Sequence, residues 1–318
     1  METLLLTRSD IAALLDMRDC IDAVETAFRL HAEGKIDPPG ILGMHVPGGG
    51  FHVKAASLRS YFAAKTNANF PGNPARGLPT IQGAILLFDA ADGRLLAIMD
   101  SAEVTAVRTG ATTGVAAKHL ARRSAATLTL LGCGAQAAAQ LRAVRAVREL
   151  QRVFVSDLDP ARAARFAQEH AAAVAADLPA ALAESDICVT CTTSRRFIVE
   201  NAWVPAGCFV AAVGADNEHK QEIDPALFRK ARVVVDSLEQ CATIGDLHHA
   251  LDAGVMTRGE VYAELGELAA GRKPGRQSDS ETILFDSTGV ALGDVAAAAA
   301  VYERALERKR GGAISLAD

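Results

Sequence analysis

The sequence has few aromatic residues, a single tryptophan and no long apolar run. Aromatic residues make up 5% of the 318 residues. Because no apolar stretch reaches the roughly 20 residues that cross a bilayer, we expect no membrane partner. The formal net charge of −5 is small, which argues against a nucleic-acid partner. The N-terminal stretch lacks a basic segment before an apolar core, so we expect no signal peptide and a cytoplasmic location.

The six cysteines are scattered through apolar stretches and form no pattern typical of a disulfide framework. Cys188 and Cys191 have C-x-x-C spacing, but alternation within a predicted strand directs their side chains to opposite faces. His248 and His249 are adjacent on a predicted helix, where neighbouring side chains point about 100° apart. We therefore expect no metal site and reduced thiols.

The predicted elements are mixed in the first part of the chain and alternate later. Up to residue 121, helices are predicted within 7–34 and 103–121, and strands within 48–58, 61–70 and 80–100, with a turn at 91–93. From residue 125, strands are predicted at 125–132, 152–157, 186–192, 208–214 and 231–236, and helices at 135–149, 160–172 and after a turn beginning at 285. Alternating strands and helices predict an α/β fold with a parallel sheet.

A glycine-rich turn separates the strand at 125–132 from the helix that follows it. Gly132, Gly134 and Ala137 fit G-x-G-x-x-A: the first glycine permits the tight turn and the second lets a pyrophosphate approach the backbone. Asp157 ends the next strand, where a carboxylate would bind the adenosine ribose and repel a 2′-phosphate, which favours NAD. Arg162 keeps NADP as an alternative. A turn of small residues that binds no ligand is the other alternative.

Motifs across nearly the whole chain are similar to those of the ornithine cyclodeaminase/μ-crystallin family. They are "KTNANFPGNPARGLPTIQG", "LLAIMDSAEVTAVRTGATTGVAAKHLA", "GCGAQ", "VGADNEHKQEID" and "FDSTGVALGDVAAA". The resemblance implies a Rossmann-type dinucleotide-binding domain at 119–289. This domain is inserted into an α+β substrate-binding and dimerisation domain at 1–118 plus 290–318. It also implies a homodimer that acts on a small amino or imino acid.

The resemblance assigns three residues to the chemistry. Lys65 would contact the substrate carboxylate and transfer a proton, Arg108 would bind substrate and cofactor, and Asp216 would exchange a proton with the substrate amine. Ordinary alternatives stay open for each: a solvated strand lysine, a helix-surface arginine and a helix-capping aspartate.

The resemblance and the glycine turn also predict the cofactor-binding residues, and Thr80 could equally be a threonine at a strand start. The predicted set is Thr80, Arg108, Gly132, Gly134, Ala135, Gln136, Asp157, Thr192, Val213, Gly214, Lys220 and Ser287.

Two departures from the family pattern bear on the reaction. Many members have a substrate-binding arginine near the position of Gly40, where this chain has none, and Lys54 stands where a methionine is common. Lys54 could replace the missing cation or be a surface lysine. His52 stands where ornithine cyclodeaminases have a glutamate, which disfavours that activity. We therefore expect an NAD(P)-dependent oxidoreductase of amino or imino acids. The alternatives are a cyclodeaminase of ornithine or lysine that recycles NAD and a crystallin-like protein that binds NAD(P) without turnover.

Overall fold

The chain divides into two compact units in a computed structural model that describes residues 2–316. The first unit comprises Met1–Arg108 and Val290–Asp318, and the second comprises Thr109–Gly289. The boundary lies inside helix α3 (Ser101–Leu120). The predicted boundary, between residues 118 and 119, lies further along the same helix.

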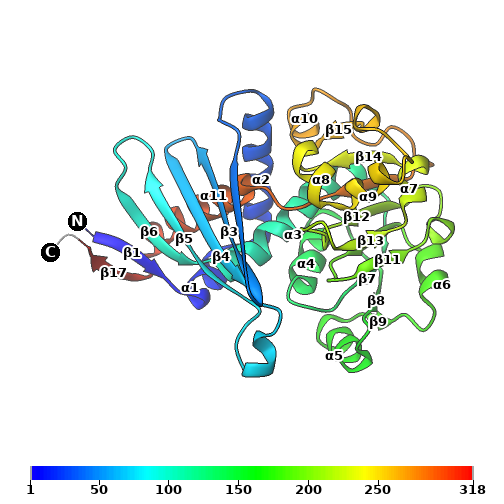
Figure 1. Cartoon of the computed structure of the whole chain (residues 1–318), viewed down its shortest axis with the longest axis horizontal. Coiled ribbons are helices and arrows are strands. Elements are labelled where there is room, and N and C mark those ends of the chain that lie inside the picture. Colours follow the sequence, from blue (N-terminus) through cyan, green and yellow to red (C-terminus); the bar gives the residue numbers. More distant parts are fainter. Residues whose placement is uncertain (1, 317–318) are drawn as a thin grey trace. The chain divides into compact units, whose positions relative to one another are not determined.

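The first unit is built on a seven-stranded sheet in which β1 pairs in parallel with β6 and every other pair is antiparallel. In sheet order the strands are β17 (Gly312–Ser315), β1 (Glu2–Leu6), β6 (Leu95–Asp100), β5 (Ile81–Asp89), β4 (Tyr61–Asn69), β3 (Gly49–Leu58) and β2 (Gly40–Val46). Because β1 pairs with β17, the first and last strands of the described chain lie side by side (Figure 1).

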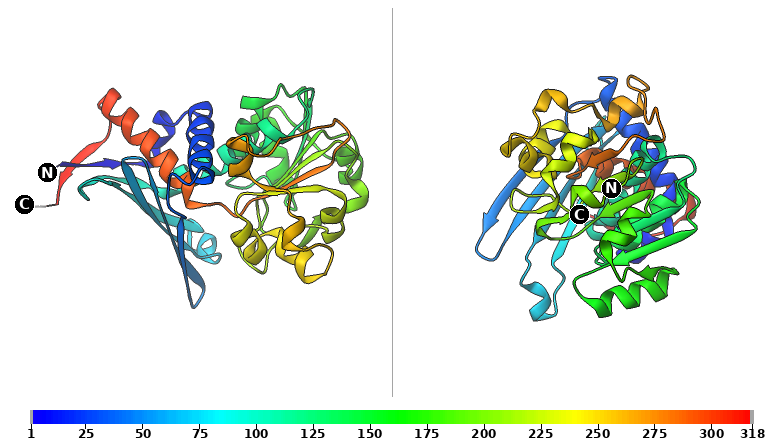
Figure 2. Two further views of the ribbon diagram at one scale, coloured as in Figure 1. Left: turned by 90° about the horizontal axis from the view of Figure 1, so that it is seen from above. Right: turned by 90° about the vertical axis from the view of Figure 1, so that its right-hand side faces the viewer.

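Three further helices complete the first unit: α1 (Arg8–Leu14), α2 (Met17–Ala32) and α11 (Ala291–Arg308). Side chains cap the first two, since Thr7 accepts a hydrogen bond from the Asp10 N–H and Asp16 accepts one from the Arg18 N–H. The helix α11 packs against β3 and β4, and α2 packs against α11 (Figure 2). The first turn of α11 therefore lies in the layer next to β4.

The second unit contains an eight-stranded sheet in which every pair of neighbours is parallel. Its order is β15 (Ala263–Glu264), β14 (Arg232–Val235), β16 (Ile283–Asp286), β12 (Phe209–Ala212), β10 (Ile187–Thr190), β7 (Thr127–Leu131), β8 (Arg152–Ser156) and β9 (Ala173–Val174). All residues of β7, β10, β12 and β16 are buried, which explains their continuous apolar runs. A separate parallel pair is formed by β11 (Arg195–Val199) and β13 (Gln221–Ile223).

Short helices connect these strands, and three 3₁₀ turns occur along the described chain. The helices are α4 (Ala137–Val147), α5 (Pro160–His170), α6 (Leu178–Ala183), α7 (Pro225–Lys230), α8 (Leu238–Ile244), α9 (Asp246–Asp252) and α10 (Leu265–Ala269). The 3₁₀ turns are η1 (Asn73–Arg76), η2 (Asn201–Trp203) and η3 (Arg258–Glu260). The predicted α/β class, with a Rossmann-type parallel sheet in one unit and an α+β arrangement in the other, is confirmed. Within residues 2–316, no helix combines the length and apolarity needed to cross a membrane.

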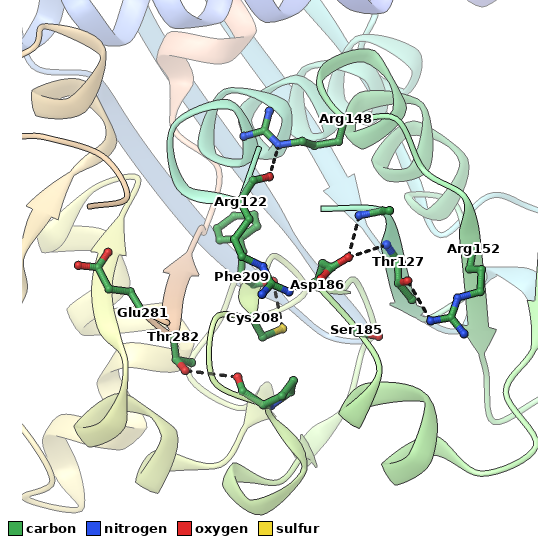
Figure 3. A network of polar contacts seen from close by, with 12 residues as sticks. Arg122, Thr127, Arg148, Arg152, Ser185, Asp186, Cys208, Phe209, Glu281 and Thr282 are labelled. Atoms are coloured by element: carbon green, nitrogen blue, oxygen red, sulfur yellow. Dashed lines mark hydrogen bonds and ion pairs between the residues drawn. The ribbon is translucent and has the colours of Figure 1, made fainter. Parts of the chain in front are cut away.

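A polar network holds the amino-terminal edge of the parallel sheet (Figure 3). Asp186, just before β10, accepts hydrogen bonds from the N–H groups of Ala126 and Thr127 at 2.7 and 2.9 Å, and it also pairs with Arg122. The Arg148 guanidinium in turn donates to the Arg122 carbonyl oxygen at 2.8 Å. These bonds tie the start of β7 to the start of β10.

Three strands in the first unit lie outside the predicted elements: β1, β2 and β17. Every residue of β2 is exposed, so this edge strand shows no alternation of buried and exposed positions. The strands β1 and β17 come from opposite ends of the chain, and their pairing is a long-range event with no local signal. The sequence missed them for these reasons.

Candidate active site

Lys65 is buried in β4, an inner strand of the first unit's sheet. Its side chain is 3% exposed, and Nζ lies 2.8 Å from Asp294 Oδ1 and 3.4 Å from Thr105 Oγ1. Residues Ala63 and Lys65 are the two buried positions of β4, two residues apart, so Lys65 occupies the sheet face that packs inward. The alternative of a solvated strand lysine is therefore wrong.

Arg108 and Lys65 share one carboxylate. The Arg108 Nε atom donates to Asp294 Oδ1 at 2.8 Å, the same oxygen that accepts from Lys65. The Arg108 side chain is 5% exposed and that of Asp294 is 2% exposed, which excludes a helix-surface role for this arginine. Asp294 occupies the first turn of α11, where the helix dipole favours a negative charge. We name Lys65, Arg108 and Asp294 the buried triad.

The surroundings of the triad shift two pKa values. Burial lowers the pKa of Lys65, the charge of Asp294 raises it, and the charges of Arg108 and Lys54 lower it; together these effects bring it to about 7. Burial would raise the pKa of Asp294, but the charges of Arg108 and Lys65 hold it below its usual value. At neutral pH, Lys65 can therefore either accept or donate a proton, whereas Asp294 stays ionised.

Lys54 lies directly across the sheet from Lys65. The antiparallel register of β3 and β4 pairs these two residues, so both side chains leave the same face. Lys54 is partly buried, and its charge is among those that lower the pKa of Lys65. His52 lies two residues earlier on the same strand and pairs with Asn67. The structure thus places a third cation beside the buried triad.

The glycine turn of the second unit has an open side. Gly132 adopts a φ of 94°, and a Cβ there would lie 2.9 Å from Thr192 Cγ2, so only glycine fits. Gly134 is exposed, and a Cβ on it would meet no described atom within 4 Å. Within the described chain, α4 has no side-chain cap and no acidic residue in its first turn. Its first N–H groups therefore suit the phosphates of a dinucleotide.

The carboxylate of Asp157 is anchored beside this turn. Oδ2 accepts a hydrogen bond from the Cys133 N–H at 2.8 Å, and Oδ1 accepts one from the Asp159 N–H at 2.9 Å. The Arg162 guanidinium donates to Oδ1 at 3.3 Å and to Oδ2 at 3.5 Å. A ribose hydroxyl would therefore bind Asp157 in place of these Arg162 contacts, because the carboxylate has about four acceptor positions and all are in use.

Asp216 and Lys220 form an ion pair in the loop between β12 and β13. Lys220 Nζ lies 2.6 Å from Asp216 Oδ1 and 3.2 Å from the Gly214 carbonyl oxygen. The Asp216 side chain is 49% exposed. Among the described elements, β13 and not a helix follows Asp216, so the helix-cap alternative is wrong.

The other predicted cofactor residues lie in both units. Thr80, in the first unit, precedes β5, and its carbonyl oxygen accepts a hydrogen bond from the Phe70 N–H at 2.8 Å. The remaining ones belong to the second unit and follow β7, β10, β12 and β16: Ala135, Gln136, Thr192, Val213, Gly214 and Ser287. The carboxyl edge of a parallel sheet is the usual ligand-binding edge of such folds.

Two carboxylates of these sites were absent from the predicted residues. Asp294 is the only acid in the run "GVALGDVAAAAAVY", and a lone acid in an apolar helix is a signal that could have marked it. Glu222 is fully buried in β13 and accepts hydrogen bonds from Thr190, Thr192 and Gly214. Glu222 lies among the polar residues of "HKQEID", a segment that the sequence alone would predict to be exposed.

The cysteine and histidine pairs have local partners. All six cysteines are free thiols; Cys188 is buried in the core, and Cys191 Sγ lies 3.3 Å from the Gly132 carbonyl oxygen. His248 Nδ1 lies 2.6 Å from the Gly245 carbonyl oxygen, and His249 Nε2 lies 2.8 Å from that of Lys220. Residues 2–316 contain no group of three potential metal ligands.

Comparison with known proteins decides the family. A sequence model of the ornithine cyclodeaminase/mu-crystallin family matches residues 1–309. The chain belongs to this family. The resemblance found in the motifs is therefore confirmed, and it extends over almost the whole length.

Relatives in the ornithine cyclodeaminase/mu-crystallin family include NAD-dependent enzymes. The chain is 40% identical over 317 residues to the alanine dehydrogenase of Archaeoglobus fulgidus, covering 99% of this chain and 98% of that protein. An archaeal alanine dehydrogenase dimer with bound NAD superposes with a TM-score of 0.96 at 39% identity, covering 99% of this chain and 100% of that one. The Thermococcus litoralis Δ¹-pyrroline-2-carboxylate reductase in complex with NADH and L-proline has a TM-score of 0.94 at 35% identity, covering 98% and 100%.

Proposed function

We propose that this protein is an NAD-dependent oxidoreductase that interconverts an imino acid and an amino acid. The buried triad carries the proposal, because two cations held on one carboxylate in the first unit can bind a small carboxylic acid. The open glycine turn supplies the second requirement, a dinucleotide-binding site. Relatives that are named alanine dehydrogenase and Δ¹-pyrroline-2-carboxylate reductase support both parts.

In the proposed reaction, NADH when bound supplies a hydride to the α-carbon of the imino acid. Arg108 binds the substrate carboxylate, and Lys65 contacts it. In reduction, Lys65 Nζ gives the imine nitrogen the proton that, together with the hydride, converts C=N into CH–NH. Asp216 exchanges the second proton, which interconverts this amine and its ammonium form, and oxidation reverses these steps. With its pKa near 7, Lys65 can serve either direction.

The cofactor-binding residues of the second unit fit NAD. Gly134 and the uncapped start of α4 leave room and N–H donors for the pyrophosphate, and Asp157 would accept hydrogen bonds from the adenosine ribose. The carboxylate would repel a 2′-phosphate, whereas Arg162 beside it would attract one. We propose NAD as the preferred cofactor and keep NADP as the alternative.

Lys54 is proposed as the substitute for the arginine that many family members place near Gly40. Its cross-strand position opposite Lys65 supports this role, because Lys54 lies on the same sheet face as Lys65 and its charge lowers the pKa of that residue. A Lys54→Met variant is then expected to raise the KM for the carboxylic acid more than it lowers kcat.

Substitutions at the two glycines of the turn distinguish an effect on cofactor binding from an effect on stability. Gly134→Ala is expected to leave Tm unchanged, because the new Cβ meets no described atom within 4 Å and the backbone is outside the left-handed region. It should still weaken NADH binding about tenfold by crowding the pyrophosphate. Gly132→Ala should cost about 1–3 kcal/mol of stability through its left-handed backbone. Fluorescence titration and thermal unfolding measure both, and wild-type NADH affinity in Gly134→Ala would contradict the assignment.

The assay that tests the function uses purified wild-type protein and follows reduced-nicotinamide absorbance. Pyruvate with ammonium, or Δ¹-pyrroline-2-carboxylate, is added to NADH and, in parallel, to NADPH. Steady oxidation of NADH supports the proposal. Ammonia released from ornithine or lysine with catalytic NAD would instead establish a cyclodeaminase. Tight NADH binding without turnover of any of these substrates would establish a binding protein.

We also propose a homodimer, with β2 as part of its interface. The side chains of Ile41, Leu42 and Met44 are 47%, 58% and 55% exposed on this edge strand, and exposed apolar clusters commonly mark interfaces. The archaeal alanine dehydrogenase of similar structure is a dimer.

Replacing Leu42 with lysine should therefore shift the protein toward monomers, because a charge would be buried in the interface. Size-exclusion chromatography with light scattering measures the mass. Leu158→Lys is the matched control, since Leu158 is an isolated, fully exposed leucine in the second unit. A Leu42→Lys variant that keeps the wild-type mass would show that the interface lies elsewhere.

A further inference from the structure

Glu222 is a buried carboxylate whose two oxygens are filled by four donors. Oε1 accepts hydrogen bonds from the Thr192 N–H at 2.6 Å and the Thr192 hydroxyl at 2.7 Å. Oε2 accepts from the Thr190 hydroxyl at 2.6 Å and the Gly214 N–H at 2.8 Å. The residue is 0% exposed. A buried charge is tolerated only when its hydrogen-bonding positions are filled, as they are here.

The donors belong to the ends of two neighbouring strands. Thr190 is the last residue of β10 and Thr192 follows it, while Gly214 follows β12, which pairs in parallel with β10. The end of β7 lies against the same point, because a Cβ on Gly132 would meet Thr192 Cγ2 at 2.9 Å. Glu222 therefore joins loops at the carboxyl edge, where parallel sheets bind ligands.

The fit around the carboxylate is tight. A Cβ on Gly214 would lie 2.5 Å from Glu222 Oε1 and still closer to the Thr192 carbonyl oxygen, so only glycine fits at this position. Burial raises the pKa of Glu222, and the hydrogen bonds from Thr190, Thr192 and Gly214 act in the opposite direction. Two backbone N–H groups can only donate, so the ionised carboxylate is the form that they stabilise.

A second buried acid holds the strand that carries Glu222. Asp246, at the start of α9, accepts hydrogen bonds through Oδ1 from the N–H groups of Glu222 and Ile223 at 2.8 and 3.0 Å. Asp246 is also 0% exposed. The position of Glu222 is thus set from its own backbone as well as by its side-chain partners.

We infer that Glu222 is a positioning residue for the cofactor, holding the Thr192 and Gly214 loops in the conformation that receives the dinucleotide. This inference rests on the proposed function, because it needs the carboxyl edge to bind NADH. Glu222 acts through these two loops and makes no contact with the cofactor itself. Loops that are already in the bound conformation improve affinity, because binding then loses less conformational entropy.

The test compares Glu222→Gln with Asp186→Asn in the full-length protein. A glutamine offers one acceptor oxygen and places an NH₂ group among donors, so at least one backbone N–H loses its partner. Asp186 is the matched control, since it also accepts two backbone N–H bonds but sits at the amino end of β10, on the opposite edge of the sheet (Figure 3). Both variants are expected to lower Tm.

Only Glu222→Gln should weaken NADH binding, by about tenfold, a change that corresponds to the loss of one hydrogen bond. Its KM for NADH should rise in parallel while kcat at saturating NADH changes less than twofold. Asp186→Asn should keep its NADH Kd within about twofold of wild type. Thr190→Val is the substitute variant if Glu222→Gln does not fold. It removes one of the four hydrogen-bond donors to Glu222 and should weaken NADH binding about threefold.

Unchanged NADH affinity in Glu222→Gln, or in Thr190→Val if that variant is the one that folds, would overturn the inference. The proposed function would then still stand, because wild-type binding and turnover of NADH are measured separately. Equal losses of affinity in Glu222→Gln and Asp186→Asn would also overturn it, since they would reflect general destabilisation. A wild-type protein that binds neither NADH nor NADPH would overturn both proposals.

Discussion

Replacing Lys65 with methionine is expected to lower kcat by about 10²- to 10⁴-fold, the usual contribution of a positioned acid or base. Methionine retains much of the side-chain volume and removes the amine, while Arg108 keeps its bond to Asp294. The variant should therefore stay folded. Steady-state kinetics with NADH and the imino acid, together with thermal unfolding, separate loss of chemistry from loss of structure.

The control for this variant is Lys35→Met. Lys35 pairs with Glu33 at the surface, where its side chain is 62% exposed, and a surface ion pair contributes little. It should keep wild-type kcat and KM. A Lys65→Met protein that turns over as fast as wild type would remove Lys65 from the mechanism.

The pKa of Lys65, about 7, also predicts how the wild-type rate depends on pH. Oxidation of the amino acid needs the neutral amine as base, so kcat/KM should rise as the pH passes upward through about 7. Reduction of the imine needs the ammonium as acid, so kcat/KM should fall over the same range. Profiles for the two directions that run in parallel would contradict this role.

Replacing Asp294 with asparagine is expected to destabilise the protein by about 3 kcal/mol, because it leaves two buried cations without their shared carboxylate. Turnover should fall as well, since the position and the pKa of Lys65 both depend on that charge. Urea denaturation at neutral pH measures the loss of stability. Asp92→Asn is the matched control, because Asp92 pairs with Arg94 in an exposed turn. It should change the free energy of unfolding by no more than about 0.5 kcal/mol.

A double variant identifies the cause of this destabilisation. In Lys65→Met/Asp294→Asn only one of the two cations remains beside residue 294. The double variant should therefore be more stable than the sum of the two single losses predicts. Strict additivity would mean that Asp294 contributes through packing in α11 and not through its charge.

Local sequence patterns predicted much of the second unit. The runs at 125–132 and 208–214 contain the fully buried strands β7 and β12, and the run at 152–157 contains the partly buried strand β8, because apolar, β-branched stretches between helices suit a parallel sheet. The glycine turn was recognisable because a left-handed backbone at Gly132 requires that residue type. Edge strands such as β2 were missed because exposed positions carry no periodic pattern.

Sequence motifs identified the candidate site residues. They did not identify the residues that those side chains contact in the folded chain. Lys65 and Arg108 are recognisable by residue type and motif, but the carboxylate that joins them lies 229 positions from Lys65. No local pattern reports such a contact. Glu222 resembles a solvated acid in its own segment, yet it is fully buried among the ends of two strands.

The sequence by itself therefore determined the α/β class, the glycine turn after β7 and the family, because each follows from periodicity or from residues close together in the chain. Only the tertiary structure decided that Lys65 and Arg108 share Asp294 and that Lys54 stands opposite Lys65. These pairings depend on packing between elements distant in the chain. Burial then changes the chemistry of the groups, and burial is a property of the folded chain alone.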